Sequence, residues 1–324
     1  MFKRLIAKGI LVCGLVIIVV LCIVLFYVSY KVKKDLENNL NQVFSDSTHY
    51  SDQISDKIPK AFLIKPFKCS GIMSFKCSSN LELKTHDEVL AKLDNFSIIV
   101  EQIRMDSVVI KTDSKIVFSS SFYSDYPAML KLLPHYFKIN LKRSVLDRKR
   151  GVILDKVDFE LDSDATSLKL GTQYELESKK FINRNAIQSI QISKDLYDGQ
   201  IDLDDKIGIH KISAYLRSKQ LKTAMMQLMQ EKKIIKDNNE SDYESKIDES
   251  FVTIGFLAGM MGPKGYILQT NQLLKGLSEL LKDQVKELSL EINSQEGSFK
   301  RWSVRELENL DLESYYDVRV ESQK

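Results

Sequence analysis

The sequence lacks the short motifs that mark common catalytic and cofactor-binding sites. It contains no GxxxxGK[ST], GxGxxG, HExxH, GxSxG or SxxK pattern, so the usual phosphate-binding, zinc and nucleophile motifs are missing. Histidine is scarce, and none of His49, His86, His135 and His210 has a second metal ligand at helical or hairpin spacing. We therefore expect no cofactor, no metal site and no enzymatic activity.

Acidic residues are absent from the first 34 positions, which hold six Lys or Arg residues. The rest of the chain then carries 41 basic (47 minus 6) against 44 acidic residues. Binding to phosphate groups requires a basic patch on the folded domain, and this near-neutral remainder does not predict one. Nucleic acid is therefore excluded as an expected partner.

Charge is also absent from residues 9–30, which are dominated by Leu, Val and Ile. A helix of this length rises about 33 Å, enough to cross a hydrocarbon core of about 30 Å. No small-residue cleavage site follows it, as a signal peptide would require. We expect residues 1–34 to form a single uncleaved membrane anchor with basic flanks, so that the lipid bilayer is one partner.

Cysteine is scarce as well, because only Cys69 and Cys77 lie outside the apolar segment. Their separation of eight residues suits a small disulfide loop better than CxxC metal or redox chemistry. The alternative is two unrelated buried thiols. A disulfide would indicate an oxidising compartment.

Asn239 belongs to a glycosylation triplet with an aspartate two positions before it, in Asp237-Asn238-Asn239-Glu240-Ser241. The stretch resembles the acidic acceptor of bacterial oligosaccharyltransferases, and a chance match is the alternative. Three basic residues lie on each side of the anchor, so the positive-inside rule does not orient it. The cysteine pair and the triplet favour a single-pass protein of a bacterial inner membrane, with a cytoplasmic N-terminus and a periplasmic C-terminal domain.

Residues 35–60 show a narrow apolar stripe with spacings of three and four, which predicts a helical stalk that Pro59 ends. One interpretation is a short coiled coil that forms a homodimer. The other is an amphipathic helix that lies on its own domain.

Alternation with a period of two predicts β-strands in residues 61–205 and 285–324. Val157, Phe159 and Leu161 alternate with charged residues, and Asp198-Gly199 predicts a hairpin turn. Strict alternation gives a strand one dry face and one wet face. The fold class that follows is α+β, with an antiparallel meander that residues 285–324 complete.

Residues 206–284 are expected to form a helical insertion, with a polar loop at 232–249. Within it, residues 251–261 and 267–281 predict an αα-hairpin around Gly262-Pro263. Methionine adapts well to variable apolar partners, and five copies cluster here, so a partner or ligand surface is one interpretation and gap-filling in a core is the other. These are Met225, Met226, Met229, Met260 and Met261.

An anchor, a stalk and a long antiparallel sheet with one dry face resemble the layout of AsmA-like, LptC-like and YdgA-type envelope proteins. The resemblance lies in the architecture and carries over no functional residue. It implies that the dry face of an incompletely closed sheet is similar to a lipid-holding groove. Our first hypothesis is an interaction protein that scaffolds or helps to assemble an envelope complex with protein partners. The alternatives are a lipid-handling protein and an enzyme of unrecognised class.

Overall fold

The computed structural model describes residues 30–38, 40–42, 60–72, 74–84, 89–120, 124, 127–190, 202, 204–236, 239–261, 264–307 and 312–324. The expected anchor helix, most of the stalk and the Asp198-Gly199 turn lie outside these residues. Within them, no helix has the length and apolar character needed to cross a membrane.

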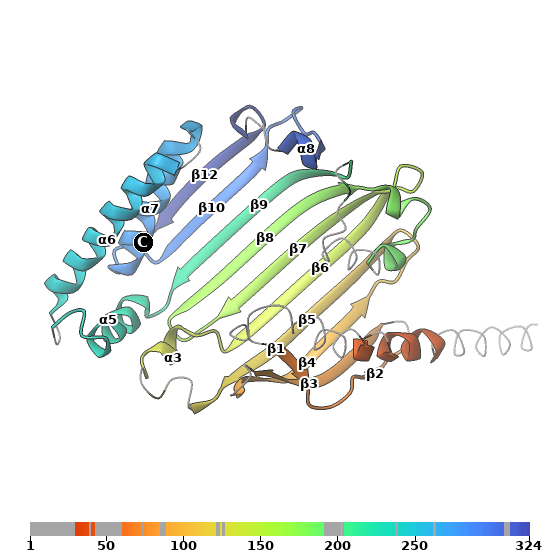
Figure 1. Ribbon diagram of the computed structural model, residues 1–324, viewed down its shortest axis with the longest axis horizontal. Helices are drawn as coiled ribbons and strands as arrows, with labels where there is room; N and C mark the ends of the chain where they lie inside the picture. The colour runs from red at the N-terminus through yellow and green to blue at the C-terminus, as the bar shows by residue number, and fades with distance from the viewer. Residues whose placement is uncertain are drawn as a thin grey trace, which may run out of the picture.

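One antiparallel sheet of 12 strands forms the body of the domain (Figure 1). The pairing order is β1-β3-β4-β5-β6-β7-β8-β9-β10-β12, with β2 added to β3 and β11 added to β9. Among the described residues no pairing joins β12 to β1, so the sheet is open. The strands are β1 (Lys60–Leu63), β2 (Lys68–Ser70), β3 (Phe75–Lys84), β4 (Val89–Glu101), β5 (Ser107–Phe118), β6 (Tyr136–Asp147), β7 (Val152–Asp162), β8 (Thr166–Glu177), β9 (Lys206–Ser218), β10 (Glu287–Ser294), β11 (Trp302–Ser303) and β12 (Tyr316–Gln323).

Helices cover the two ends of the sheet. Figure 1 places α5, α6 and α7 beside the C-terminal strands and the N-terminal helix, described at 30–38 and 40–42, at the opposite end. The α+β class and the antiparallel meander are confirmed. The remaining elements are α3 (Met129–Leu132), α5 (Leu221–Glu231), α6 (Glu240–Met261), α7 (Ile267–Leu281), α8 (Val304–Leu307), η2 (Lys179–Phe181), η3 (Lys264–Tyr266) and η4 (Leu312–Ser314).

Three sequence-based boundaries differ from the structure. The first part of the expected helical insertion, residues 206–218, is strand β9, because it pairs along most of its length with both β8 and β10. The expected polar loop at 232–249 ends early, since Asn239 caps α6 by accepting a hydrogen bond from the Asp242 amide at 3.0 Å. Ile190, expected in a strand, lies in a helix that begins at residue 186 behind a reciprocal Asn185–Gln188 capping pair.

The cysteine pair joins strand β2 to strand β3. Cys69 lies opposite Cys77 in the β2–β3 register, and their Sγ atoms are 1.89 Å apart, at bonding distance. The predicted disulfide is therefore confirmed. Both cysteines belong to the apolar cluster on which Leu36 and Leu40 of the N-terminal helix pack. Glu37 of this helix also accepts a hydrogen bond from the Cys69 amide at 2.7 Å.

A buried ion pair lies under the helix that begins at residue 186. The Arg143 guanidinium donates to both carboxylate oxygens of Asp155, at 2.7 and 2.6 Å, and these side chains are 3% and 1% exposed. Ser189 accepts a further bond from Arg143 at 3.5 Å, and the guanidinium lies 5.9 Å from the centre of the Phe181 ring. A bidentate pair of this kind fixes the geometry of both partners, so it seats this helix on β6 and β7.

Tyr243 is the centre of the helical insertion. Its side chain is fully buried against α5 and α7, and its hydroxyl donates to the Leu281 carbonyl at 2.9 Å. Burial, with the charge of Glu244 as a smaller cause, raises the pKa of Tyr243 to about 12. The insertion is thus built around a tyrosine that stays protonated in the folded state.

Stability should fall at high pH because of Tyr243. In the unfolded chain its pKa returns to the ordinary value of 10.0, so between pH 10 and 12 the folded state binds more protons than the unfolded state. The free energy of unfolding then decreases as pH rises through this window, by up to about 2.7 kcal/mol. Denaturant unfolding at pH 9 and pH 11.5 measures this decrease. Tyr243→Phe should show a smaller decrease than wild type, and equal decreases would contradict the assignment.

Candidate functional site

The two faces of the sheet differ sharply in chemistry. Residues paired directly across antiparallel strands lie on the same face, so the register identifies rows of side chains that run across the sheet. Two rows span β5 to β12 on one face, which we call the dry face. The first is Ile110, Leu141, Val157, Thr172, Ile212, Ile292 and Val318, and the second is Thr112, Ile139, Phe159, Leu170, Ala214, Leu290 and Val320.

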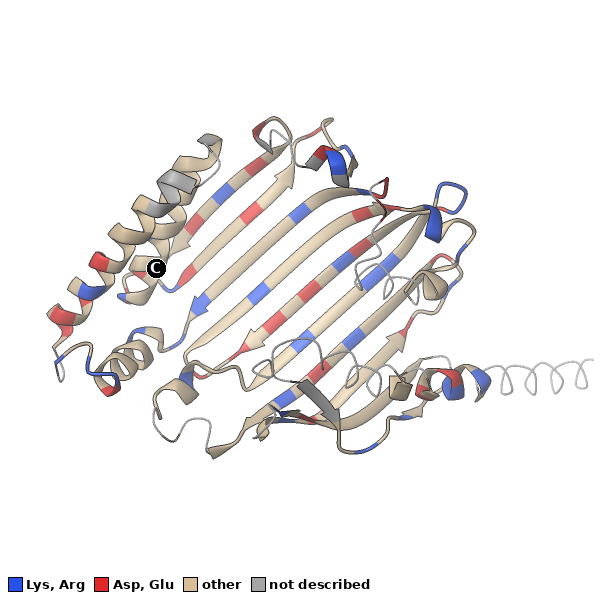
Figure 2. Ribbon diagram, viewed as in Figure 1, with Lys and Arg blue, Asp and Glu red and all other residues tan. Residues whose placement is uncertain are grey.

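The opposite face, called the wet face, carries charges. Figure 2 shows Lys, Arg, Asp and Glu alternating with uncharged residues along the central strands. Lys169 pairs with Glu160 at 3.1 Å, and Lys211 with Glu291 at 2.7 Å. Such cross-strand ion pairs on an exposed surface contribute little to stability. The wet face is therefore suited to contact with water, whereas the apolar side chains of the dry face require shielding from water.

Three helices pack over the ends of the dry face. The N-terminal helix packs over β3–β5, the helix from residue 186 packs over the ends of β4 to β6, and α7 contacts β10 and β12. Between these covers the apolar side chains of β6–β8 are half-buried, and Leu170 is 39% exposed. The centre of the dry face is therefore accessible apolar surface.

An apolar cleft of about 350 Å³ lies where α7 meets the sheet. A Cβ atom on Gly276 would lie 2.5 Å from Leu288 Cδ1, so this glycine allows α7 to approach the sheet closely. None of the lining side chains is charged. They come from β9 (Ile209, Ile212), from β10 (Leu290, Ile292), from β12 (Tyr316, Val318) and from η3 and α7 (Tyr266, Gln269, Thr270, Leu273).

The residues predicted from alternation belong to this surface. Val157 and Phe159 lie in the two rows that contain lining residues of the cleft, which are Ile212, Ile292 and Val318 in the first row and Leu290 in the second. Leu161 lies in the next row beside Leu168. Strands lie about 4.8 Å apart, so Val157 on β7 is about 14 Å from Ile292 on β10. The cleft and the open centre of the sheet form one continuous dry face.

The methionines occupy a different place. Met225, Met226 and Met229 pack around Ile235, Tyr243 and Ile247 inside the helical insertion. They fill the space between α5 and α6 and do not line the cleft. The side chains of Met260 and Met261 lie outside the described residues.

Asn239 is exposed at the start of α6. Its Oδ1 atom caps the helix, whereas a glycan would be attached to Nδ2. Glycosylation of Asn239 therefore stays a prediction.

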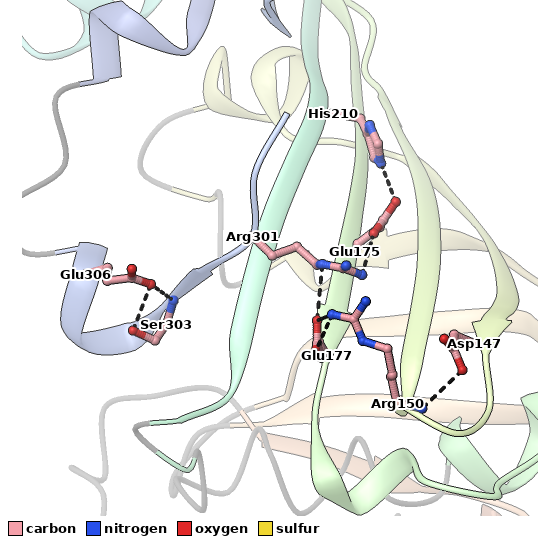
Figure 3. A network of polar contacts seen from close by, with 8 residues as sticks. All are labelled: Asp147, Arg150, Glu175, Glu177, His210, Arg301, Ser303 and Glu306. Carbon is pink, nitrogen blue, oxygen red and sulfur yellow. Dashed lines mark hydrogen bonds and ion pairs between the residues drawn. The ribbon is translucent and has the colours of Figure 1, made fainter. Parts of the chain in front are cut away.

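A polar network on the wet face ties the segment before β11 to β8 and β9 (Figure 3). His210 Nε2 lies 2.8 Å from Glu175 Oε1, and its ring stacks on Phe299 with centroids 3.9 Å apart. Arg301 bridges Glu175 at 3.1 Å and Glu177 at 3.2 Å. The imidazole thus contacts a carboxylate and a phenyl ring, and Arg301 links the same carboxylate to the segment, so we assign the network to holding the segment in place.

Gly208 of β9 has no side chain, so the segment before β11 can pass close to the strand at this position. A Cβ atom there would lie 2.8 Å from the Phe299 ring and 2.9 Å from the Lys300 carbonyl oxygen.

Elsewhere on the wet face, a hollow of about 310 Å³ lies over Gly171, and its lining includes both lysines and carboxylates. Within the described ranges, no group of three or more His, Cys, Asp or Glu side chains could hold a metal ion.

Sequence reasoning missed two features of the site. It did not find α7 as the cover of the cleft, nor Gln269 as a polar group in it. The available signal was the position of Gln269 on the same helical face as Tyr266 and Leu273, three and four residues away.

Comparison of the sequence with protein-family models and with curated proteins finds no match to either.

Proposed function

We propose that this protein is a membrane-anchored envelope protein that binds an apolar, chain-like molecule such as a lipid on the dry face of its open sheet. The observation that carries the proposal is the continuity of the apolar rows from the half-exposed centre of the sheet into the cleft under α7. A monomeric soluble domain normally buries such a surface, and large exposed apolar patches mark interaction sites. Ligand pockets are likewise mostly apolar with a few polar groups.

Site-specific photo-crosslinking in cells tests this proposal. In the full-length protein, a benzophenone amino acid at Phe159 points to the dry face, and at Lys156 of the same strand it points to the wet face. We expect an adduct with the mass of a lipid at position 159 and none at position 156. A protein-sized adduct at 159, or equal labelling at both positions, would overturn lipid binding by this face.

The scaffold function remains a second candidate because of an apolar patch on the α6–α7 hairpin. Val252 is 73% exposed and Phe256 is 69% exposed on α6, and Ile254 on α6 and Ile267 and Leu268 on α7 are exposed as well. If this patch binds an envelope protein, a partner should copurify after gentle detergent extraction. Phe256→Glu should release it, whereas Gln272→Glu on the exposed side of α7 should not. A partner retained by Phe256→Glu would remove the patch from consideration.

A further inference from the structure

Helix α6 extends beyond the part of the domain that covers it. Tyr243 and Ile247 lie on the face of α6 that packs against α5 and α7, and both are buried. Ile254 continues this face, because it follows Ile247 by seven residues, or about two turns. It is nevertheless 45% exposed. In the outer half of α6, the face that points to the core at the start of the helix is therefore open to its surroundings.

The opposite face of α6 changes from polar to apolar along the helix. Ser245, Glu249, Val252 and Phe256 follow one another at spacings of four, three and four residues, which places them on one face. All four are exposed, and only the last two are apolar. A groove on a partner protein normally receives a helix with a single apolar face. The outer half of α6 instead exposes apolar side chains on two opposite faces.

The sequence places almost no charge at this end of the α6–α7 hairpin. Residues 251–268, which we call the hairpin end, contain one charged residue, Lys264, and residues 251–263 contain none. An uncharged apolar run of this length is too short to span a bilayer and is typical of a buried core helix or of a re-entrant or interfacial segment. The exposure of Val252, Ile254 and Phe256 argues against a buried core helix. A single cation beside the run complements anionic lipid headgroups.

Helix α6 supplies internal partners for the polar groups of its outer half. Residues 251–261 belong to the helix, so their backbone N–H groups donate within it. Thr253 has the only polar side chain in this stretch, and its hydroxyl donates to the Glu249 carbonyl at 3.0 Å. A bilayer core offers no partner to a polar group, so a segment in contact with lipid must satisfy its own. These donors meet that requirement.

We propose that the hairpin end inserts into the surface of a phospholipid bilayer, with Val252, Ile254 and Phe256 among the lipid chains. The inference rests on the membrane-anchored state of the proposed function. The expected anchor at 9–30 would keep the domain close to membrane surfaces and so raise the effective concentration of lipid around it. The exposed patch on the hairpin is thereby assigned to lipid and not to a protein partner.

The cleft under α7 adjoins the hairpin end. Tyr266 and Gln269 line the cleft, whereas Ile267 and Leu268, which lie between them in the sequence, are exposed. The first turn of α7 thus contributes both to the cleft and to the exposed patch. Insertion brings the cleft next to lipid, which shortens the path of an apolar ligand through water.

Tryptophan scanning with brominated lipids tests the insertion. The full-length protein would be reconstituted in vesicles of phosphatidylcholine and phosphatidylglycerol. Dibrominated lipid, which quenches tryptophan on contact, would be supplied either in the same bilayer or in separate added vesicles. Wild type provides the baseline, because its single tryptophan, Trp302, is buried.

The variants place a second tryptophan at two positions on one face of α6. Interfacial segments lie about 5–10 Å deep in the boundary between headgroups and acyl chains, so we expect about twofold quenching of the added emission in Phe256→Trp. Ser245→Trp, three turns earlier beside the acidic residues of α6, should show no quenching beyond the baseline. Both positions are exposed, so neither substitution disturbs the core.

Each outcome decides for or against the inference. Quenching at position 256 alone supports insertion, and the arm in which it occurs identifies the bilayer. Equal quenching at positions 245 and 256 would overturn insertion by the hairpin end, because the acidic half of α6 would then contact lipid as well. Absence of quenching at position 256 in both arms would also overturn it, and release of a protein by Phe256→Glu would then identify the patch as a protein interface. Lipid adducts at Phe159 in that case would leave the apolar binding function in place.

Discussion

Asp155→Ala is expected to lower the free energy of unfolding by about 3–5 kcal/mol, because it leaves the Arg143 guanidinium buried without its counter-charge. Both side chains are almost fully buried on a face that is otherwise apolar. Urea unfolding of the full-length protein in detergent micelles, followed by the fluorescence of the single tryptophan, Trp302, measures the loss. Trp302 suits this purpose because it is buried in β11, which pairs with β9.

A matched control lies on the same strand. Asp158→Ala changes a 43% exposed carboxylate on the wet face and should alter the free energy of unfolding by no more than about 0.5 kcal/mol. The double variant Arg143→Leu with Asp155→Leu should recover most of the loss, since an apolar pair leaves no unpaired charge. If Asp155→Ala cost as little as Asp158→Ala, the ion pair could not be what seats the helix on β6 and β7.

Tyr243→Ala should cost a similar amount, about 3–5 kcal/mol, through the cavity left by a fully buried aromatic ring. The loss should be local, because the described side chains packed around Tyr243 belong to the helical insertion, on α5, α6 and α7 and the turn between α5 and α6. Hydrogen exchange of peptides from α5, α6 and α7 should accelerate, while peptides from β6–β8 keep their protection. Such a result would identify the insertion as a separate cooperative unit.

Tyr243→Phe is the control for the hydroxyl. It keeps the ring and removes only the hydrogen bond to the Leu281 carbonyl, so it should cost about 1 kcal/mol. Acceleration of exchange in the sheet as strongly as in the insertion would instead show that the two parts unfold together.

Local sequence patterns predicted the strands that have one exposed face. Val157, Phe159 and Leu161 alternate with charged residues, and the structure places them in β7 as expected. Residues 206–218 were misassigned because Ile212, Tyr215 and Leu216 fit a helical spacing as well as a strand. Pairing with β8 and β10 decides the outcome, and neither partner is visible in a local pattern.

The site was less predictable than the fold. Alternation indicates that each strand has a dry side, but it does not give the register that brings Val157 and Ile292 into one row. The cleft also depends on the close approach of α7 at Gly276. Glycine inside a helix can serve packing, yet sequence alone does not say which surface it approaches.

The helical insertion lies between β9 and β10 in the chain, and this position determines the order in which the sheet can form. Strands β3 to β9 each pair with the strand before them, whereas β10 reaches β9 only after α5, α6 and α7 have been made. Contacts between distant segments form later than local ones because chain closure costs entropy, and synthesis proceeds from the N-terminus. The cleft is therefore the last region to form, and a nascent chain that stops before β10 would expose the apolar rows of β9 without their neighbour. A ligand held under α7 can bind only the completed polypeptide.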